Sequence, residues 1–263
     1  MRSRLALRGV ALAYLAALLV LPVGLVFYRT FEHGFGAAWD SVTTPAAQHA
    51  FWLTVQLVAI AVPLNTIFGI VAALAIVRHR FRGRGLVNAL IDIPFAVSPV
   101  VVGLALILVY GRHGWFGAWL IDHGVQVIFS TPGMVLATVF VSLPFVVREV
   151  IPVLREVGSE QEDAAATLGA TPLQTFWRIT LPAIRWGVAY GVVLTTARAL
   201  GEFGAVSVVS GHVAGQTETL TLQVQDRFEA FDLTGAYAAS LVLGSMAVAT
   251  LLLMTLLRRK EVA

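Results

Sequence analysis

The sequence predicts an all-α polytopic membrane protein with about six transmembrane helices, folded as a single domain over residues 1–263. Hydrophobic residues make up 58% of the chain and charged residues only 13%, whereas a soluble domain carries about 25% charged residues. Six apolar runs are long enough to cross about 30 Å of hydrocarbon, which requires about 20 helical residues. Cysteine is absent, which excludes disulfide bonds and thiolate chemistry.

Each predicted span must be helical, because lipid cannot satisfy unpaired backbone groups. The six ranges are 9–29, 51–77, 86–110, 131–148, 183–209 and 234–257. The first run is too long for the apolar region of a signal peptide and no A-x-A cleavage site follows it, so we expect it to be retained. In the third run, Pro94 and Pro99 remove helix hydrogen bonds, which fits either a cavity lining or a packing kink.

The arginine and lysine residues predict that both termini are cytoplasmic. Fourteen of them flank the spans on one side, whereas Arg29, Arg112 and Arg227 lie on the other side and Arg198 lies within a span. The fourteen are Arg2, Arg4, Arg8, Arg78, Arg80, Arg82, Arg84, Arg148, Arg155, Arg178, Arg185, Arg258, Arg259 and Lys260. Because positive residues stay on the cytoplasmic side, the connection between spans four and five is expected there. This placement accounts for a pI near 9.7 without nucleic acid as a partner.

The longest connection on the opposite side is rich in aromatic residues. Residues 111–130 carry Trp115, Phe116 and Trp119 in a weakly amphipathic stretch. Aromatic rings concentrate at the boundary between lipid and water, so this stretch is expected to form an interfacial belt.

The cytoplasmic connection, residues 159–182, reads SEQEDAAATLGATPLQTFWRITLP. Ser159 and Glu162 have the spacing of a capping box, and Gly169 stands where a helix would end in the left-handed conformation. The T-P-L-Q sequence that follows predicts a second capped helix with proline at its first position. We therefore expect two short helices at an angle, joined by a tight turn, with the second ending at the I-T-L-P sequence.

Several apolar residues in this connection need a partner surface. They are Ala164, Ala165, Leu168, Leu173, Phe176, Trp177 and Ile179. A capped helix alone is compatible with an ordinary cytoplasmic loop, but an exposed loop gains nothing from so many apolar side chains. Alanine lets the backbone of a partner approach closely, and a capped helix is stiff. The residues therefore predict a docking element for a soluble protein.

The same connection resembles the cytoplasmic loop of ABC importer permeases, which reads E-A-A-x3-G-x9-I-x-L-P. The match runs from D-A-A-A-T-L-G to I-T-L-P with the full spacing, and its one departure is Asp163 in place of glutamate. The resemblance implies the type I ABC importer permease fold, with residues 159–182 as the coupling loop that sits in a groove of an ATPase subunit. The ATPase-coupling residues it implies are Glu162, Asp163, Ala164, Ala165, Gly169, Ile179, Leu181 and Pro182.

A second resemblance begins in span five, where the chain reads ARALGEFGAVSVVSGHVAGQT. The R-A-L-G-E-F-G-A core is similar to sulfate and molybdate permeases, and its continuation resembles the W-type subunit of sulfate/thiosulfate importers. This implies that the chain forms half of the translocation pathway in a cell membrane complex. The implied partners are a homologous second permease of the T type, two ATPase subunits, an extracytoplasmic sulfate-binding protein and membrane lipid.

ATP hydrolysis is expected on a separate chain. Lys260 is the single lysine of the sequence, and no G-x4-G-K-[ST] motif is present to hold nucleotide phosphates. We therefore expect this chain to be a permease without enzymatic activity or a cofactor of its own, with ATP and Mg²⁺ held by the ATPase subunits. The six histidines lack the spacing of metal ligands, so no metal site is expected.

Two alternatives compete with the sulfate assignment. A molybdate or tungstate permease would carry the same motifs. A secondary transporter would need intramembrane ionisable groups and repeated halves, for which only Asp92, Arg198 and Glu202 qualify and no repeat is apparent. A rhomboid-type protease is disfavoured because its G-x-S-G nucleophile motif is missing its first glycine at Val208.

Three residues are candidates for the translocation path: Arg198, Glu202 and Ser98. Arg198 and Glu202 are spaced i and i+4 in the fifth span, so both would project from one helix face. Gly201 and Gly204 flank the glutamate and would let a neighbouring helix approach. Two interpretations stay open, namely an ion pair that locks the span and an anion site in which the glutamate moderates binding by the arginine.

Overall fold

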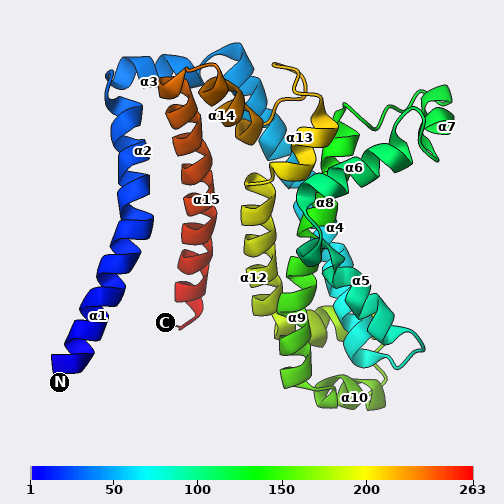
Figure 1. The fold of residues 1–263 in the computed structure, drawn as a ribbon. Coiled ribbons are helices and arrows are strands. Elements are labelled where there is room, and N and C mark those ends of the chain that lie inside the picture. The colour runs from blue at the N-terminus through cyan, green and yellow to red at the C-terminus, as the bar shows by residue number, and fades with distance from the viewer. Residues whose placement is uncertain (1, 263) are drawn as a thin grey trace.

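The computed structural model describes the backbone of residues 2–262 and the side chains of residues 7–252 and Thr255. Arg2, Arg4, Arg258, Arg259 and Lys260, counted above for orientation, lie outside the described side chains. Over the described residues the chain is all-α, as predicted (Figure 1).

The first half of the chain holds α1 (Arg2–Leu15), η1 (Ala16–Val20), α2 (Leu21–Phe31), α3 (Phe35–Val42), α4 (Pro45–Arg78), α5 (Arg84–Ala96), α6 (Pro99–Tyr110) and α7 (Gly117–Asp122). The second half holds α8 (Thr131–Ser142), α9 (Pro144–Val157), α10 (Glu160–Thr167), α11 (Pro172–Thr175), η2 (Phe176–Thr180), α12 (Leu181–Leu200), α13 (Gly204–Ser210), α14 (Leu220–Glu229) and α15 (Leu233–Val262). The η elements are π-helical turns.

The number of spans agrees with the prediction. Five described helices are long and apolar enough to cross a membrane, and a bent pair brings the total to six. The second span, α4, begins six residues before its predicted start at residue 51, because Thr44 caps it and Pro45 occupies its first position. The Ala47 N–H donates to the Thr44 hydroxyl at 3.2 Å.

The third predicted span, residues 86–110, is not one straight helix. It is broken into α5 and α6, and the helix direction bends by 112° between them. Proline is the cause, because Pro99 has no N–H for a continuing helix and its ring drives the preceding residue out of the helical region. Val97 is extended and Ser98 has ψ of 135°, so the chain turns there. Pro94, by contrast, lies inside α5.

The fifth predicted span, residues 183–209, is shifted toward the N-terminus. Its helix runs from Pro172 to Leu200, and α13 is a separate short helix. The helix ends at Gly201, whose N–H bonds back to the Ala197 carbonyl, and the next residue leaves the helical path. The sequence hid this break because, apart from Arg198 and Glu202, the runs on both sides are mostly apolar.

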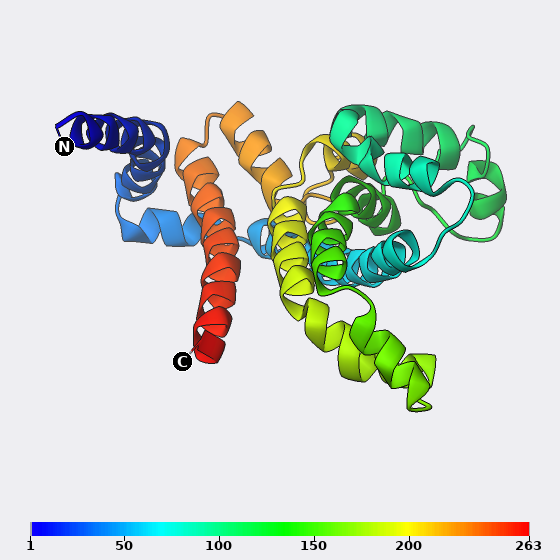
Figure 2. The same cartoon turned by 90° about the horizontal axis from the view of Figure 1, so that it is seen from below.

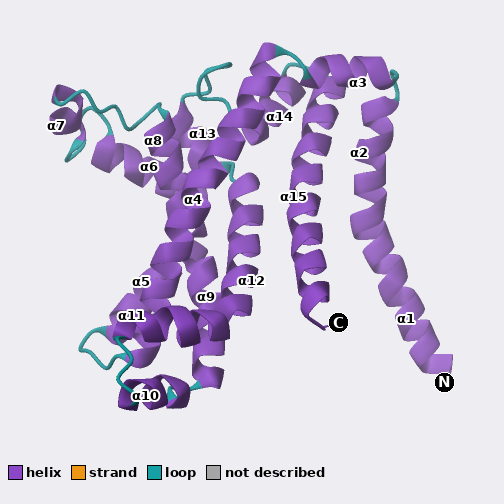
Figure 3. Ribbon diagram, turned by 180° about the vertical axis from the view of Figure 1, so that it is seen from behind, coloured by secondary structure: helices purple, strands orange, loops and turns teal. Residues whose placement is uncertain are grey.

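The spans stand side by side and their connections gather at the two ends (Figures 1 and 3). One end carries α3, which lies across the helix direction, together with α13 and α14; the other carries α10 and both chain ends (Figure 1). Both termini therefore lie on the side of the predicted coupling loop, in agreement with an even number of spans. Figure 2 shows α1 and α2 at the edge of the molecule, away from the group formed by α4, α8 and α9.

The centre of the molecule is a crossing of α4, α9 and α12 around Val146. A Cβ atom added to Gly69 would lie 2.5 Å from the Val146 Cβ, and one added to Gly191 would lie 2.7 Å from its Cα. Val146 itself is fully buried. Small residues at such a crossing let helix backbones approach in the absence of a hydrophobic drive between spans. The relative positions of three spans thus depend on two glycines.

We predict that Gly191→Val destabilises the chain, because the added side chain would collide with the backbone at Val146. Overpacking of this kind costs about 1–3 kcal/mol. The measurement is the melting temperature and the yield of monodisperse protein in detergent. Gly24→Val is the matched control, since nothing lies within 4 Å of a Cβ at Gly24. Equal melting temperatures for the two variants would contradict the role assigned to the crossing.

Candidate functional site

The turn predicted at Gly169 is present. Helix α10 ends at Thr167, and Gly169 has φ of +85° in the left-handed region. The Gly169 N–H bonds to the Ala166 carbonyl and the Ala170 N–H to the Ala165 carbonyl, each at 3.0 Å. This bonding pattern closes the end of a helix and suits glycine, which pays no Cβ penalty there.

The capping box predicted at Ser159 is wrong, whereas the second one is confirmed. The Ser159 hydroxyl donates to the Asp163 carboxylate at 3.0 Å and caps no backbone group. Glu162 is drawn away from the cap by Arg78, an ion-pairing partner that competes with a backbone N–H. In the second box the Gln174 N–H donates to the Thr171 hydroxyl at 3.3 Å and the Thr171 N–H donates to the Gln174 side chain at 2.9 Å.

The sequence analysis predicted that the second helix of the loop ends at the I-T-L-P sequence, and this is wrong. The helix continues into the membrane span. The π-helical turn η2 makes this continuation possible, because the Leu181 N–H bonds to the Phe176 carbonyl five residues back. Pro182 then falls in the first turn of α12, where its missing N–H is tolerated. The second helix of the predicted coupling loop is therefore continuous with the helix of the fifth span.

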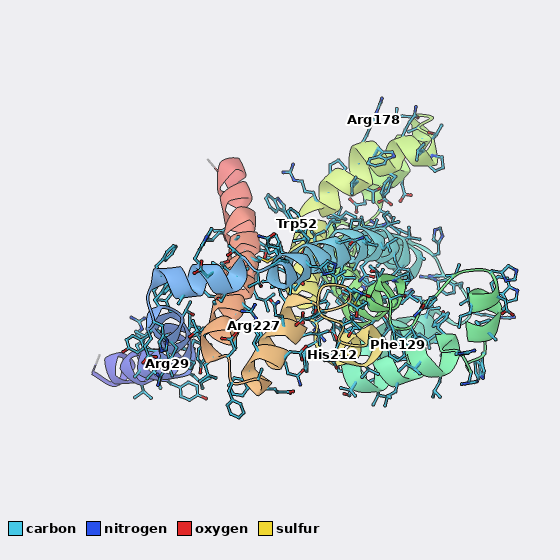
Figure 4. The ribbon with its side chains drawn as sticks, turned by 90° about the horizontal axis from the view of Figure 1, so that it is seen from above. Arg29, Trp52, Phe129, Arg178, His212 and Arg227 are labelled. Carbon is cyan, nitrogen blue, oxygen red and sulfur yellow. The ribbon has the colours of Figure 1, made fainter. Side chains whose placement is uncertain are left out.

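Three large apolar side chains are exposed on the segment formed by α10, α11 and η2. Leu168 is 88% exposed, Leu173 68% and Trp177 60%. Figures 1 and 2 show α10 and its neighbours projecting from the end of the molecule, and Figure 4 places Arg178 at the far tip of the same segment. A surface of this kind is available to a soluble partner.

The predicted coupling residues divide between two faces. Asp163, Ala164, Gly169 and Pro182 are exposed; Glu162, Ile179 and Leu181 are half-buried; Ala165 is buried. One face of the loop is thus free for a partner, and the other packs on the body of the protein.

Arg78, at the end of α4, ties the inner face of the loop to the spans. Its guanidinium donates to both carboxylate oxygens of Glu162, at 2.9 and 3.3 Å. It also donates to the carbonyls of Leu154 at 3.2 Å and Gly158 at 2.5 Å. The Thr180 hydroxyl donates to Glu162 at 2.8 Å. Sequence analysis missed this cluster, because Arg78 and Glu162 are 84 residues apart and Arg78 was counted only as one of a group of orienting charges.

Arg198 and Glu202 form an ion pair, with 2.7 Å between Nη2 and Oε2. The arginine side chain is 29% exposed and the glutamate side chain 2%. The expectation that both project from one helix face is wrong, because the helix ends at Leu200 and Glu202 follows the break. The Glu202 carboxylate instead accepts from the Ala205 N–H at 2.8 Å, at the start of α13. The pair therefore spans the break between two helices.

The two glycines beside this pair have different surroundings. A Cβ at Gly204 would lie 2.9 Å from the Pro99 side chain, so the predicted close approach of a neighbouring helix is confirmed there. A Cβ at Gly201 would lie 3.6 Å from the carbonyl oxygen of Ala197, in the helix that Gly201 follows, and within 4 Å of no other element. The predicted approach of a neighbouring helix at Gly201 is therefore wrong.

A small polar cavity adjoins Glu202. It holds about 10 Å³ and is lined by residues that include Thr54, Thr138, Thr219 and Thr221. This volume is about that of one water molecule. The Thr221 hydroxyl donates to the Glu202 carbonyl at 2.8 Å. The cavity therefore lies where α4, α8, the end of α12 and the start of α14 meet.

The remaining candidates, Ser98 and Asp92, flank the break in the third span. Ser98 is exposed at the bend between α5 and α6 and makes no side-chain cap there. Asp92 pairs with Arg148 of α9, whose Nε donates to its carboxylate at 2.7 Å. Each of the three ionisable residues expected within spans thus has a charged partner. A secondary transporter would use such groups to bind its coupling ion, so this pairing argues against that alternative.

The opposite end carries a polar network between α13 and α14, outside the spans; Figure 4 looks onto this end and labels His212 and Arg227. His212 lies 3.4 Å from Asp226. Burial raises the pKa of Glu218 above its ordinary value of 4.5, and neighbouring Asp226 adds to the rise, whereas Arg227 and His212 oppose it. Among the described residues no group of three or more acidic or histidine side chains could hold a metal ion.

The predicted aromatic belt forms a projection at the same end. Trp115, Phe116 and Trp119 are exposed around α7, which stands away from the body of the molecule (Figure 1). Beside it, a cleft of about 660 Å³ lies between the end of α6 and residues 121–129. An exposed ring surface at this end suits the lipid–water boundary.

Comparison with known proteins places the chain among transporters. Residues 65–261 match the family described as the binding-protein-dependent transport system inner membrane component. The sulfate transport system permease protein CysW of Synechococcus elongatus is 49% identical over 97% of this chain and 90% of its own length. The sulfate transport system permease protein CysT of Salmonella typhimurium is 38% identical over 90% of this chain and 86% of its own length.

Two solved structures share the fold. A bacterial ABC transporter involved in the import of the acidic polysaccharide alginate superposes with a TM-score of 0.82 at 18% identity, covering 98% of this chain and 96% of the other. A bacterial alginate ABC transporter in complex with its alginate pentasaccharide-bound periplasmic protein superposes with a TM-score of 0.80 at 18% identity, covering 97% and 93%. The importer permease fold predicted from the coupling loop is confirmed.

We predict that the buried Glu218 makes the chain less stable at higher pH. A raised pKa in the folded state contributes stability that is present below the unfolded pKa, near 4.5, and is lost as the pH rises through the folded pKa. The melting temperature in detergent should therefore fall over this window in the wild type and fall less in Glu218→Gln. Glu156→Gln, at an exposed position, should follow the wild type. Parallel pH profiles for all three would contradict this assignment.

Proposed function

Because the chain belongs to the family of binding-protein-dependent transport system inner membrane components, a multi-pass inner membrane protein family, we propose that it is the permease of an ATP-driven importer of sulfate and thiosulfate. Its likeness to sulfate transport permeases along almost the whole chain is the observation that carries the substrate. In this proposal the chain forms half of the translocation pathway, and residues 159–182 form the coupling loop.

The other half would come from a second permease of the CysT type, since that subunit resembles this chain along most of its length. An extracytoplasmic binding protein would deliver the anion, as a periplasmic protein does in the alginate transporter of the same fold. Two ATPase subunits would hold ATP and Mg²⁺, because this sequence lacks a P-loop. This chain would bind no cofactor of its own.

The exposed apolar surface of α10, α11 and η2 supports the docking of an ATPase subunit. Leu168 and Trp177 present large apolar side chains, and the exposed Ala164 leaves room for a partner backbone. Acidic residues in the first turn of α10 stabilise that helix through its dipole. The helix would therefore stay intact when a bound ATPase subunit moves it.

Arg198 supports passage of an anion. It lies in the last turn of α12, two residues before the helix break, and its guanidinium is partly open while its partner Glu202 is buried. A partly neutralised arginine suits a divalent oxyanion that must leave as readily as it enters, since conduction requires weak sites.

The proposal is tested by reconstituting this chain with the second permease, the ATPase and the binding protein in liposomes. Uptake of labelled sulfate should require ATP and the ATPase subunit and should be independent of an ion gradient. Competition by thiosulfate but not by molybdate should mark the substrate class. Uptake driven by an ion gradient without the ATPase would overturn the proposal, and preference for molybdate would move it to the molybdate and tungstate alternative.

We further predict that Gly169→Val uncouples uptake from ATP hydrolysis while the spans stay inserted. The position is open, with nothing within 4 Å, so the effect comes from the left-handed backbone that a β-branched residue disfavours. Binding of the ATPase and uptake should both fall. Gly85→Val is the matched control, because Gly85 is equally open and has no positive φ. Normal ATPase binding in Gly169→Val would count against the docking role of α10.

Substitutions of Arg198 and Glu202 can distinguish a structural role of this ion pair from a role in transport. Arg198→Gln leaves a buried carboxylate without its charge partner, which should lower the amount of assembled complex. Adding Glu202→Gln should restore assembly, and we expect the double variant to transport sulfate poorly, because the attraction for the anion is gone. Uptake and assembly are measured in parallel. Full recovery of uptake by the double variant would show that the pair is only structural.

A further inference from the structure

We propose that Glu162, and not the neighbouring Asp163, transmits the movement of α10 to the membrane spans, through a clamp formed by Arg78, Glu162 and Thr180. This inference rests on the proposed function, because it takes α10 as the helix that an ATPase subunit moves. It concerns positioning residues, since none of the three needs to contact the anion, ATP or the partner.

The two adjacent acidic residues have opposite environments. Asp163 is exposed, and the one hydrogen bond described for its side chain comes from Ser159, the residue just before the same helix. Glu162 is half-buried and accepts three hydrogen bonds, two from Arg78 of α4 and one from Thr180 of η2. Asp163 can therefore face a partner, whereas the carboxylate of Glu162 is already occupied by the body of the protein.

Arg78 makes the clamp rigid. Besides Glu162, its guanidinium holds the carbonyls of Leu154 and Gly158, where α9 ends and turns into α10. A planar guanidinium with several donors fixes orientation as well as distance, which a single ammonium group does not. The Arg78 side chain is 16% exposed and that of Glu162 is 20% exposed, so water competes little for these bonds. One side chain thus joins the ends of α4 and α9 to the start of α10.

The clamp acts on two spans at once. Arg78 is the last residue of α4, which runs without interruption from Pro45, and Thr180 is continuous with α12. At a rise of about 1.5 Å per residue, α4 covers about 36 Å between Arg78 and Thr54, and α12 covers about 30 Å up to Leu200. Both lengths match the thickness of the hydrocarbon core, about 30 Å.

The far ends of these two spans meet at one place. Thr54 of α4 and Glu202, just beyond α12, both line the small polar cavity described above. The Thr54 hydroxyl accepts from the Leu220 N–H at 3.0 Å, and Glu202 pairs with Arg198. A displacement of α10 that moves both helices together would therefore reach the Arg198 site from two sides, whereas a loose α10 could bind the ATPase and leave that site unmoved.

The first experiment compares Glu162→Ala with Asp163→Ala in the reconstituted complex. Alanine keeps the helix propensity of α10 high in both variants. Glu162→Ala should retain ATPase binding but lower the sulfate taken up per ATP hydrolysed by about 5-fold or more, the lower end of measured couplings between sites. Asp163→Ala should weaken ATPase binding and leave that ratio near the wild-type value. Arg78→Gln should behave like Glu162→Ala, and Arg80→Gln, an exposed neighbour, should behave like the wild type.

The second experiment restores the connection without the charges. Since the chain contains no cysteine, the double variant Arg78→Cys with Glu162→Cys carries only two thiols. In a complex whose other subunits lack accessible cysteine, this variant should be uncoupled when reduced. A short thiol cross-linker should raise its uptake per ATP again, and cleavage of the linker should abolish the gain.

The outcomes distinguish the clamp from the function on which it rests. If the wild-type complex takes up no sulfate with ATP, the proposed function fails. If the wild type transports and Glu162→Ala keeps the wild-type ratio, or loses ATPase binding as its main defect, the clamp is overturned and Glu162 is an ordinary or a docking residue. A cross-linked double variant that stays uncoupled would also overturn it.

Discussion

The need to pair every charge that lies within or beside lipid governs this structure. Arg78, Arg148 and Arg198 each meet a carboxylate on a different segment or beyond a helix break. A charge near the bilayer centre costs at least about 2.5–3.5 kcal/mol on insertion scales, so each pair constrains where its helices can stand. The pairs therefore constrain how the helices that carry them stand relative to one another.

The two helix breaks lie next to each other because of the same constraint. Pro99 starts α6 after one break, and Gly204 starts α13 after the other. The Pro99 side chain lies close to the backbone of Gly204. Non-helical backbone is tolerated at membrane depth only when its polar groups find partners inside the protein. Glu202 supplies that partner by accepting from the Ala205 N–H. Glu202 thus satisfies the backbone at the break and also pairs with Arg198.

Residues 159–182, the proposed coupling loop, pack against the protein on one face and expose the other. Its inner face is held by the Arg78 guanidinium and by the continuous helix through η2, whereas its outer face exposes Leu168 and Trp177. A π-helical turn at this junction accommodates Pro182 and keeps the loop in line with α12. The segment is therefore joined to the spans by continuous helix and by side-chain hydrogen bonds.

Much of this architecture is local and could be predicted from the sequence. The apolar runs give the number of spans, and the left-handed turn at Gly169 and the box formed by Thr171 and Gln174 follow from residues a few positions apart. The break at Ser98 has a local cause in Pro99, although the sequence did not tell which of Pro94 and Pro99 would end the helix. The break at Gly201 was decided by the tertiary structure, because neither proline nor a change of hydropathy marks it in the sequence. The tertiary structure alone decided the partner of Glu162, since a local backbone cap and an arginine 84 residues away compete for one carboxylate, and only the packing of α4 against α9 brings the arginine within reach.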